Sequence, residues 1–563
     1  MKKLFFILCC IPFFLGCAKL DLNPLSEGSS ENWFSNETEL TLSLNDLYRE
    51  YLWAQEQNYQ TERMTDNWSQ RQAVDAYAAG TVTSEWAFGG DVWLNTYKGI
   101  ARANTILNNQ EKAAANIPAE KLKQLAGEAY FFRAVLYGRL IFHYGDVPFY
   151  KEELSIDDSF KLGRTDKQTI LKEVYNDFDM AINSLPVTYG TGQKRVTKGA
   201  ALAFKARIAL YMGDYAVARD AAKACIDLNT YSLHTDYAQY FLSSTRNSPE
   251  TIFAIPRSAA LGSTWATTNF FPRTAGGSAV AQPSWELFSS FPCKDGLPID
   301  ESPLYNPRKP FANRDPRCTA TIVEFGTEFL GYIYDPNPNT TRVLKTSTNA
   351  LVSNKDTRSV DQFASYNGLT LKKGVDADWA DDLKTDFDII IMRYADVLMM
   401  YAEAKMELNE TDDESLKALN TVRARAYHAN VSATGSYPAV TTMDQNALRR
   451  IIRIERRIEF AWENRRYDDL IRWKLAGKAL TRPIYGMLDP AELKTKVVDA
   501  GLWVFPGTPD IDADGLPDFT AMYNTRLIKL LVARNFDVNK QYLWPIPSKE
   551  IIINKNLKQN PGY

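Results

Sequence analysis

The sequence predicts a mainly α protein in which antiparallel helix pairs form a scaffold that carries long loop-rich insertions and a few short strands. Apolar residues recur at helical spacing in several windows, and in residues 39–53 they include Leu40, Leu44 and Leu47, as expected for one buried helix face. The same spacing recurs at residues 91–109, 119–144 and 446–475. Residues 245–380, by contrast, are rich in Pro, Gly, Thr and Asn and show few such stripes, which indicates a loop-rich insertion.

The clearest helical unit is the segment 196–229. Thr197 can cap a first helix, several Ala residues allow close approach of a partner helix, and Gly213-Asp214 ends it before a second helix begins at Tyr215. This pattern resembles a tetratricopeptide repeat, a unit that cannot bury its own apolar face and needs stacked neighbours. Similar patterns occur at residues 121–145 and 390–427. Because the units are scattered, we expect a helical scaffold with insertions rather than a regular solenoid.

The composition of two other segments also predicts their conformation. Short apolar runs in the insertion, such as Thr319–Phe325, are expected to form strands. The C-terminal segment 541–563 contains Pro545, Pro547 and Pro561, so it is expected to be mostly extended.

Composition places the chain among ordinary globular proteins. Hydrophobic residues make up 45% of the 563 residues, and charged residues make up 24%. The net charge is −3, and removal of Lys2 and Lys3 with a leader makes it −5. This balance gives no electrostatic reason to expect nucleic acid as a partner.

The N-terminus has the pattern of a secretory signal peptide over residues 1–16. Lys2 and Lys3 precede an apolar run of 12 residues that ends before Gly16, which is too short to span a bilayer. Cys17 directly follows Gly16, as in a bacterial lipobox, so we expect Cys17 to carry lipid and residues 17–36 to form an anchor and tether. A plain signal peptide with an incidental cysteine is the alternative.

Cysteine and histidine counts limit the chemistry further. Once the leader and Cys17 are set aside, Cys225, Cys293 and Cys318 remain, so at most one disulfide forms within the chain. The chain has three His, and it contains no HExxH, CxxC, GxSxG or P-loop sequence. No cofactor is required by these features. Paired carboxylates could still make a glycosidase, and counting acidic residues does not exclude one.

One loop could hold a metal ion. Asp510, Asp512 and Asp514 alternate in the loop 510–518, Gly515 allows a sharp turn, and Asp518 follows. Carboxylates at alternate loop positions suit a hard cation such as calcium. Because Ala521 stands where an EF-hand has its closing Glu, a full EF-hand is excluded. A structural calcium and a solvated polar turn both stay open.

The charge-rich segment 451–473 alternates Arg with Glu and Asp. A surface for nucleic acid would not interleave acids in this way, so we interpret the pairs as internal salt bridges that tie helices together.

Six motifs together resemble the SusD/RagB family of outer-membrane nutrient-binding lipoproteins. In chain order they are CAKLDLNPLSE, GEAYFFRAVLYGRLIFHYGDVPF, the segment 196–229, RYADVLMMYAEA, ERRIEFAWENRRYDDLIRW and YLWPIPSKEIIINKNLKQNPGY. The resemblance implies one SusD-like domain over residues 37–563. It also implies a non-catalytic cell-surface protein that captures oligo- or polysaccharide. Its tetratricopeptide-like side would pack against a SusC-like TonB-dependent transporter, and its ligand site would lie in the loop-rich part.

Sugar recognition needs aromatic faces together with planar polar side chains, so aromatic residues in polar loops are the best candidates. Residues 63–93 and 263–293 qualify. Our first expectation is stacking on Trp68 or Trp86, with Asp66 and Asn67 holding hydroxyls. The remaining candidates in and beyond these regions are Trp265, Cys293 and Arg358.

Two other function classes remain open from the sequence. A surface glycoside hydrolase would need two carboxylates facing each other in a cleft. A tetratricopeptide-type adaptor that binds only protein would lack an aromatic platform outside its docking face. A nutrient other than a glycan is also open.

Overall fold

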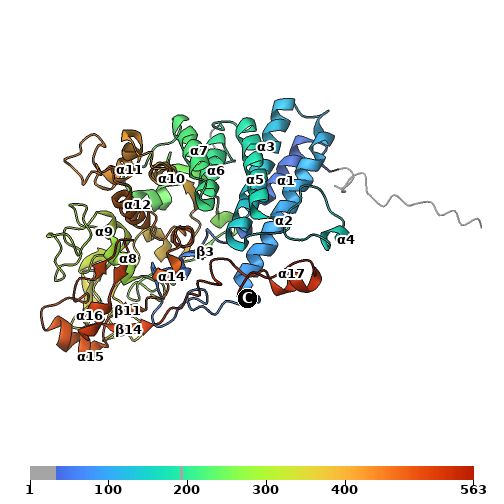
Figure 1. The fold of residues 1–563 in the computed structure, drawn as a ribbon. Coiled ribbons are helices and arrows are strands. Elements are labelled where there is room, and N and C mark those ends of the chain that lie inside the picture. The colour runs from blue at the N-terminus through green and yellow to red at the C-terminus, as the bar shows by residue number, and fades with distance from the viewer. Residues whose placement is uncertain (1–32, 191–193) are drawn as a thin grey trace, which may run out of the picture.

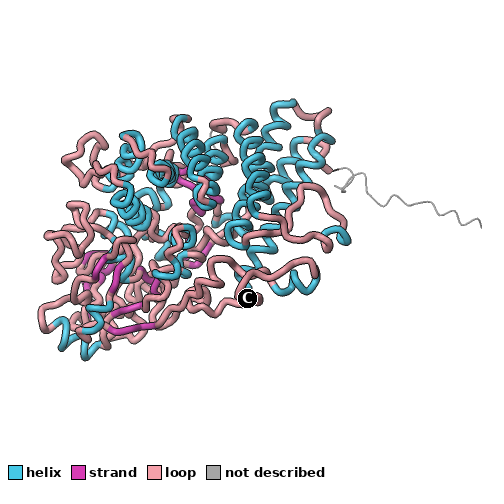
Figure 2. The backbone as a smooth tube through the Cα atoms, in the orientation of Figure 1, coloured by secondary structure: helices cyan, strands magenta, loops and turns pink. Residues whose placement is uncertain are grey.

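The computed structural model describes residues 33–190 and 194–563, so the expected signal peptide and Cys17 lie outside the described residues. Long helices form one side of the molecule, and the short strands and most of the loops gather on the other (Figures 1 and 2). The mainly α prediction, with long insertions and few short strands, is therefore confirmed.

The long helices stack side by side in a continuous layer (Figure 1). They are α1 (Glu37–Asn45), α2 (Ala87–Asn109), α3 (Ala119–Tyr144), α5 (Lys167–Ser184), α6 (Lys198–Met212), α7 (Tyr215–Asp227), α10 (Tyr394–Glu407), α11 (Asp413–Ala426) and α12 (Gln445–Glu459). The shorter helices are α4 (Ile156–Ser159), α8 (Trp285–Ser290), α9 (Arg317–Thr321), α13 (Arg466–Arg472), α14 (Ala476–Ala479), α15 (Pro490–Glu492), α16 (Thr520–Asn524) and α17 (Ser548–Ile553).

The predicted helix pair at 196–229 is present as α6 and α7. The Thr197 hydroxyl accepts a hydrogen bond from the Ala200 amide at the start of α6, which satisfies one of the unpaired amides of the first turn. Gly213 ends α6 with a φ of 79°, a left-handed conformation that glycine adopts without steric cost. The Asp214 carboxylate then caps α7. Local capping residues therefore fix both ends of this unit.

The strands are short and pair antiparallel. They are β1 (Trp68–Ser69), β2 (Thr251–Ile255), β3 (Trp265–Ala266), β4 (Gln282–Pro283), β5 (Thr327–Phe329), β6 (Tyr332–Tyr334), β7 (Arg342–Lys345), β8 (Ala350–Ser353), β9 (Lys384–Thr385), β10 (Ile389–Arg393), β11 (Ile484–Gly486), β12 (Asp510–Ile511), β13 (Pro517–Asp518) and β14 (Lys529–Val532). Strands β5 to β8 form one four-stranded sheet, and the others pair in twos, including β2 with β10 and β3 with β9.

The charged segment 451–473 forms internal salt bridges, as predicted. Glu459 is fully buried between Arg393 at 2.7 Å and Arg317 at 2.9 Å. Arg456 likewise meets Asp469 at 3.0 Å. Burial alone would raise the pKa of Glu459, but the surrounding guanidinium groups outweigh it and hold that pKa below its usual range. These pairs join α12 to the helices and loops around it.

Three local expectations are wrong. Residues 446–475 form two helices, because α12 ends at Glu459 and the chain turns sharply before α13. The run Thr319–Phe325 begins inside the short helix α9 and contains no strand. Residues 39–53 continue past α1 as tight 3₁₀ turns instead of one helix. In the C-terminal segment, α17 interrupts an otherwise extended chain.

Candidate functional site

A pocket lies where the helical layer meets the insertion, and we call it the Trp265 pocket. Trp265 reaches it from β3, which pairs with β9 so that Trp265 lies opposite Thr385. Its other lining residues come from the segment 56–59, from the ends of β2 and β10, from the segment 373–388 and from the turn after α12. They include Glu56, Asn58, Tyr59, Arg257, Lys373, Trp379, Phe387, Asp388, Trp462, Glu463 and Asn464. The cavity volume is about 120 Å³, so it can hold only a small part of an extended ligand.

Aromatic rings form the wall of this pocket. The rings of Tyr59 and Trp265 meet edge to face with centroids 5.6 Å apart, and Tyr59 meets Trp462 in the same way at 5.1 Å. Trp265 is half-buried and rests on the buried ring of Phe270. Because each ring is held by the next, the platform is rigid before any ligand arrives.

Charged groups of both signs lie beside the aromatic wall. The Arg257 guanidinium donates to Glu50 at 3.0 Å and to the Asn58 side chain at 2.7 Å. Lys373 donates to the Glu463 carboxylate and to the Ala461 carbonyl oxygen at 2.9 Å. Burial lowers the pKa of Lys373 to about 8.

The turns that carry this wall adopt strained backbone conformations. Asn58, Tyr59, Trp462 and Asn464 have φ values of 51°, 57°, 61° and 58°, in the left-handed region, which Asn adopts readily and a bulky aromatic residue rarely occupies. Such strain persists only where the surroundings enforce it, and it concentrates at functional sites. The Trp462 indole N–H is also buried without a hydrogen-bond partner among the described residues.

The Glu62 carboxylate fixes the turn that carries Trp462 and Asn464. Its carboxylate accepts hydrogen bonds from the Trp462 amide at 3.3 Å and the Asn464 amide at 3.1 Å. The Asn464 side chain in turn accepts from the Thr61 amide at 3.1 Å. Burial raises the pKa of Glu62 to about 7. The hydrogen bonds of Thr61, Glu62 and Asn464 thus join the segment next to Tyr59 to the turn that carries Trp462.

The expectation that Asp66 and Asn67 contact ligand hydroxyls is wrong, because both side chains are buried. Asp66 is 2% exposed, and Arg466 grips both its carboxylate oxygens at 2.8 Å while Arg457 approaches to 3.0 Å. Asn67 is fully buried and bridges Glu62 to Arg457. Both side chains stabilise the pocket wall from behind, where no ligand reaches.

The two tryptophans that we expected to stack on sugar are also placed inside the fold. Trp68 is 6% exposed and stacks against Trp462, so it lies behind the pocket wall. Trp86 is half-buried at the start of α2, where it packs edge to face against Trp544 with centroids 5.0 Å apart. Neither residue lines the Trp265 pocket.

Cys293 and Arg358 lie elsewhere. Cys293 is fully buried, and Cys225, Cys293 and Cys318 are all thiols without a disulfide, so Cys293 is not placed to touch a ligand. Arg358 pairs with Asp489 at 2.8 Å and covers the Tyr366 ring. Of the predicted glycan residues, Trp265 alone lines this pocket.

The loop 510–518 does not gather its carboxylates. Asp510 and Asp518 lie opposite each other on β12 and β13. Asp512 pairs with Arg482 at 2.8 Å, and Asp514 pairs with Lys478 at 2.6 Å. Within residues 33–190 and 194–563, no group of three or more His, Cys, Asp or Glu is arranged to hold a metal ion. The expected convergence of four carboxylates on calcium is therefore absent, because basic side chains occupy the loop.

Several residues that line the Trp265 pocket were not among those predicted from the sequence. Tyr59 lies in the polar stretch AQEQNYQTER, and Trp379 and Phe387 lie in the acid-rich stretch 375–388. The criterion that selected Trp265, an aromatic residue in polar sequence, would also have found these three. Trp462 carries no such signal, because it follows an amphipathic helical segment and has the apolar neighbours Phe460 and Ala461.

Comparison with known proteins identifies the family. The SusD family model matches residues 249–563, which is more than half of the chain. The chain belongs to the SusD/RagB family. A second model, described as starch-binding and associating with the outer membrane, matches residues 20–210. The SusD-like resemblance is thereby confirmed, and the family is one of carbohydrate-binding proteins associated with the outer membrane.

Relatives of this SusD/RagB protein are similar over most of their length. One SusD-like protein of Formosa agariphila is 27% identical over 68% of this chain and 70% of its own, and another is 23% identical over 98% and 97%. The crystal structure of a SusD-like carbohydrate-binding protein from Bacteroides fragilis is 27% identical, with a TM-score of 0.76, and the match covers 93% of this chain and 99% of the other. No helix in the described parts of this SusD/RagB chain combines the length and apolar character that a membrane crossing needs.

Proposed function

We propose that this protein captures an oligo- or polysaccharide at the Trp265 pocket and delivers it to a SusC-like TonB-dependent transporter without catalysing a reaction. The observation that carries the proposal is the aromatic platform of Tyr59 and Trp265 beside the guanidinium of Arg257. Flat aromatic faces cover the C–H face of a sugar ring, and planar polar groups bind its hydroxyls. The Bacteroides fragilis relative is itself a carbohydrate-binding protein.

The pocket is suited to one sugar unit of a longer chain. Its volume is small, and Trp265 is half-buried at its mouth, so neighbouring sugar units would extend into solvent. Neutral glycans fit this mixture of donors and acceptors.

The carboxylates of the pocket support binding rather than hydrolysis. Asp388 pairs with Lys194 at 2.6 Å, Glu56 lies 3.4 Å from Arg139, and Glu463 pairs with both Lys373 and Arg393. A glycosidase needs one carboxylic acid that can donate a proton and a second carboxylate nearby. Incubation with the bound polysaccharide should release no new reducing ends. Steady release that is lost when one carboxylate is changed would place the protein among glycoside hydrolases.

Anchoring and delivery rest on the family and on the N-terminal sequence. Cys17 would carry lipid and hold the chain on the cell surface, and the stacked helices would face the transporter. Affinity purification from native membranes in mild detergent should recover a large TonB-dependent protein, and Cys17→Ala should release the chain from the membrane. Recovery of the chain alone would argue for an independent binding protein.

The glycan specificity is tested by an array screen of the non-acylated chain, Cys17→Ala. Binding to one class of oligo- or polysaccharide supports the proposal. Binding to no glycan, with capture of a protein partner only, would favour the adaptor class.

A further inference from the structure

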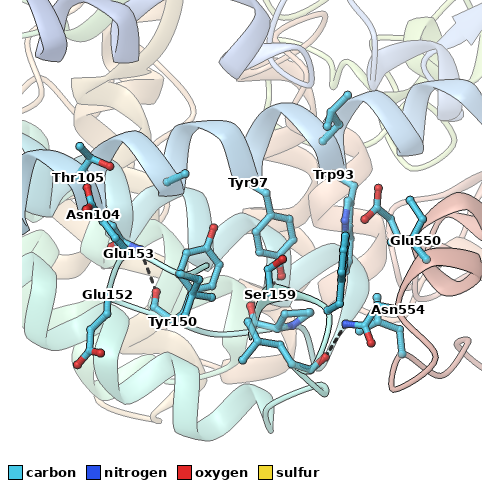
Figure 3. A pocket seen from close by; sticks show the side chains of 18 residues that line it. Trp93, Tyr97, Asn104, Thr105, Tyr150, Glu152, Glu153, Ser159, Glu550 and Asn554 are labelled. Carbon is cyan, nitrogen blue, oxygen red and sulfur yellow. Dashed lines mark hydrogen bonds between the residues drawn. The ribbon is translucent and has the colours of Figure 1, made fainter. Parts of the chain in front are cut away.

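A second and larger cavity lies between α2, the segment 148–162 and α17 (Figure 3). We call it the α2–α17 cleft. Its volume is about 520 Å³, within the range typical of small-molecule sites. None of its lining residues is shared with the Trp265 pocket.

Aromatic side chains form the wall of the α2–α17 cleft. Trp93 and Tyr97 project from α2 (Figure 3), and their ring centroids lie 5.0 Å apart. The Tyr150 ring is nearly parallel to Tyr97, with an angle of 8° between the planes. The Tyr97 hydroxyl donates to the Pro148 carbonyl oxygen at 2.8 Å, and the Tyr137 hydroxyl donates to the Tyr150 carbonyl oxygen at 2.8 Å. The wall is therefore fixed by the protein and does not depend on a ligand.

The charged residues that line the cleft are all acidic. They are Glu152, Glu153 and Glu550, and no Lys, Arg or His lines the cavity as the structure describes it. Glu152 and Glu153 lie at the exposed rim. Glu550 is half-buried, and its pKa is raised by burial with no contribution from a hydrogen bond or an ion pair. In the Trp265 pocket, by contrast, the carboxylates have cationic partners.

We propose that the α2–α17 cleft binds a small organic cation, a ligand whose ammonium group lies against Trp93 and Tyr97 and pairs with Glu550. Aromatic faces attract cations through their negative π surface. Glu550 supplies the opposite charge where water is partly excluded. A neutral ligand of the same shape would bury the Glu550 carboxylate without a partner, and that costs binding free energy.

The rim of the cleft suits the rest of such a ligand. Phe160 and Ile553 are 46% and 57% exposed, and both line the cavity. They offer an apolar surface to the carbon body of the cation. Two basic residues near the lining segments in the chain are already engaged, because Lys151 pairs with Glu173 and Arg164 donates to Asn560 and to the Asp146 carbonyl oxygen. Neither neutralises Glu550.

The test compares two ligands of equal shape. Choline and its uncharged isostere, in which carbon replaces the nitrogen, are titrated into the non-acylated chain and followed by saturation-transfer NMR. We expect choline to bind about tenfold more tightly than the isostere. We expect Glu550→Gln to remove most of this preference, because the amide keeps the shape and loses the charge.

Two controls locate the effect. Glu324→Gln changes an exposed carboxylate that lies outside both cavities, and Trp265→Ala alters the glycan pocket; both should leave choline binding unchanged. Equal binding of the two ligands, binding of neither, or an unchanged preference in Glu550→Gln would overturn the proposal. Because glycan capture is assigned to other residues, these outcomes leave the proposed function unaffected.

Discussion

Trp68 stacks against Trp462 with ring centroids 4.8 Å apart and an angle of 25° between the planes. Trp68 follows the buried pair Asp66 and Asn67, and Trp462 lines the Trp265 pocket. The segment 62–68 therefore supports the wall of the Trp265 pocket from behind, and Glu62, Asp66 and Asn67 within it make their hydrogen bonds to the protein.

The stacking predicts that Trp68→Ala destabilises the fold. Trp68 is 6% exposed, and truncation of a buried Trp leaves a cavity that costs about 3–5 kcal/mol. Urea unfolding followed by circular dichroism should show this loss in the free energy of unfolding. Leu261→Ala is the control, because Leu261 is 86% exposed and should behave as wild type. A stable Trp68→Ala with weakened glycan affinity would instead restore Trp68 as a ligand residue.

Asp66→Asn should also be strongly destabilising. Asp66 neutralises Arg457 and Arg466, which are 3% and 4% exposed, and removal of one partner of a buried ion pair costs about 3–5 kcal/mol. Asp220→Asn is the matched control: Asp220 pairs with Arg219 at the surface with 68% of its side chain exposed, where such pairs contribute about 0–1 kcal/mol. Equal unfolding midpoints for the two variants would contradict the buried network.

The raised pKa of Glu62 predicts that the stability of the fold depends on pH. Its pKa rises from 4.5 to about 7 on folding, so the folded state holds a proton that the unfolded state releases between these values. The stabilising contribution is complete below the unfolded pKa and is lost as the pH rises through the folded pKa. The free energy of unfolding should therefore fall between about pH 4.5 and 7. Asp468 contributes in the same direction, since burial raises its pKa to about 7.

Glu62→Gln removes the titrating group, while its single amide oxygen keeps only one of the two hydrogen bonds that the carboxylate accepts from the Trp462 and Asn464 amides. The slope of stability against pH, rather than the absolute stability, therefore isolates the effect of titration. Urea unfolding at several pH values should show a shallower decline for the variant than for the wild type. Identical slopes would mean that Glu62 keeps an ordinary pKa in the folded protein.

Calcium should not stabilise the chain through the loop 510–518. Lys478, Arg453 and Arg482 already pair with Asp512 and Asp514, so a cation would have to displace them. Melting temperatures measured with calcium and with a chelator should agree. A rise with calcium that disappears in Asp514→Asn would contradict this expectation.

Local signals explain which parts of the fold were predictable. The α6–α7 pair could be predicted from the sequence, because Thr197, Gly213 and Asp214 act within their own turns. The break after α12 could not be predicted in this way. Glu62 holds Trp462 and Asn464 in left-handed conformations, and it lies about 400 residues away in the chain. A contact of this kind leaves no periodic pattern in the sequence.

Local sequence signals likewise predicted the position of one site residue and failed for others. Trp265 followed from its polar neighbours, and its position on β3, opposite Thr385 of β9, agrees with an insertion residue that lines a pocket. Asp66 and Asn67 have equally polar neighbours, but Arg457 and Arg466 meet them only in the folded chain. Sequence polarity alone could not distinguish a buried ion pair from a surface hydroxyl contact.

The affinity of the Trp265 pocket for the glycan found in the array screen tests the proposed function most directly. Calorimetric titration of Trp265→Ala should show binding weakened by about 1–3 kcal/mol, roughly 5- to 150-fold, because the stacking face is lost. Trp503→Ala is the matched control: Trp503 is also half-buried but packs near Phe325, away from the pocket. Its affinity should equal that of wild type. Unchanged affinity in Trp265→Ala, with both variants folded, would contradict the assignment of the glycan site to this pocket.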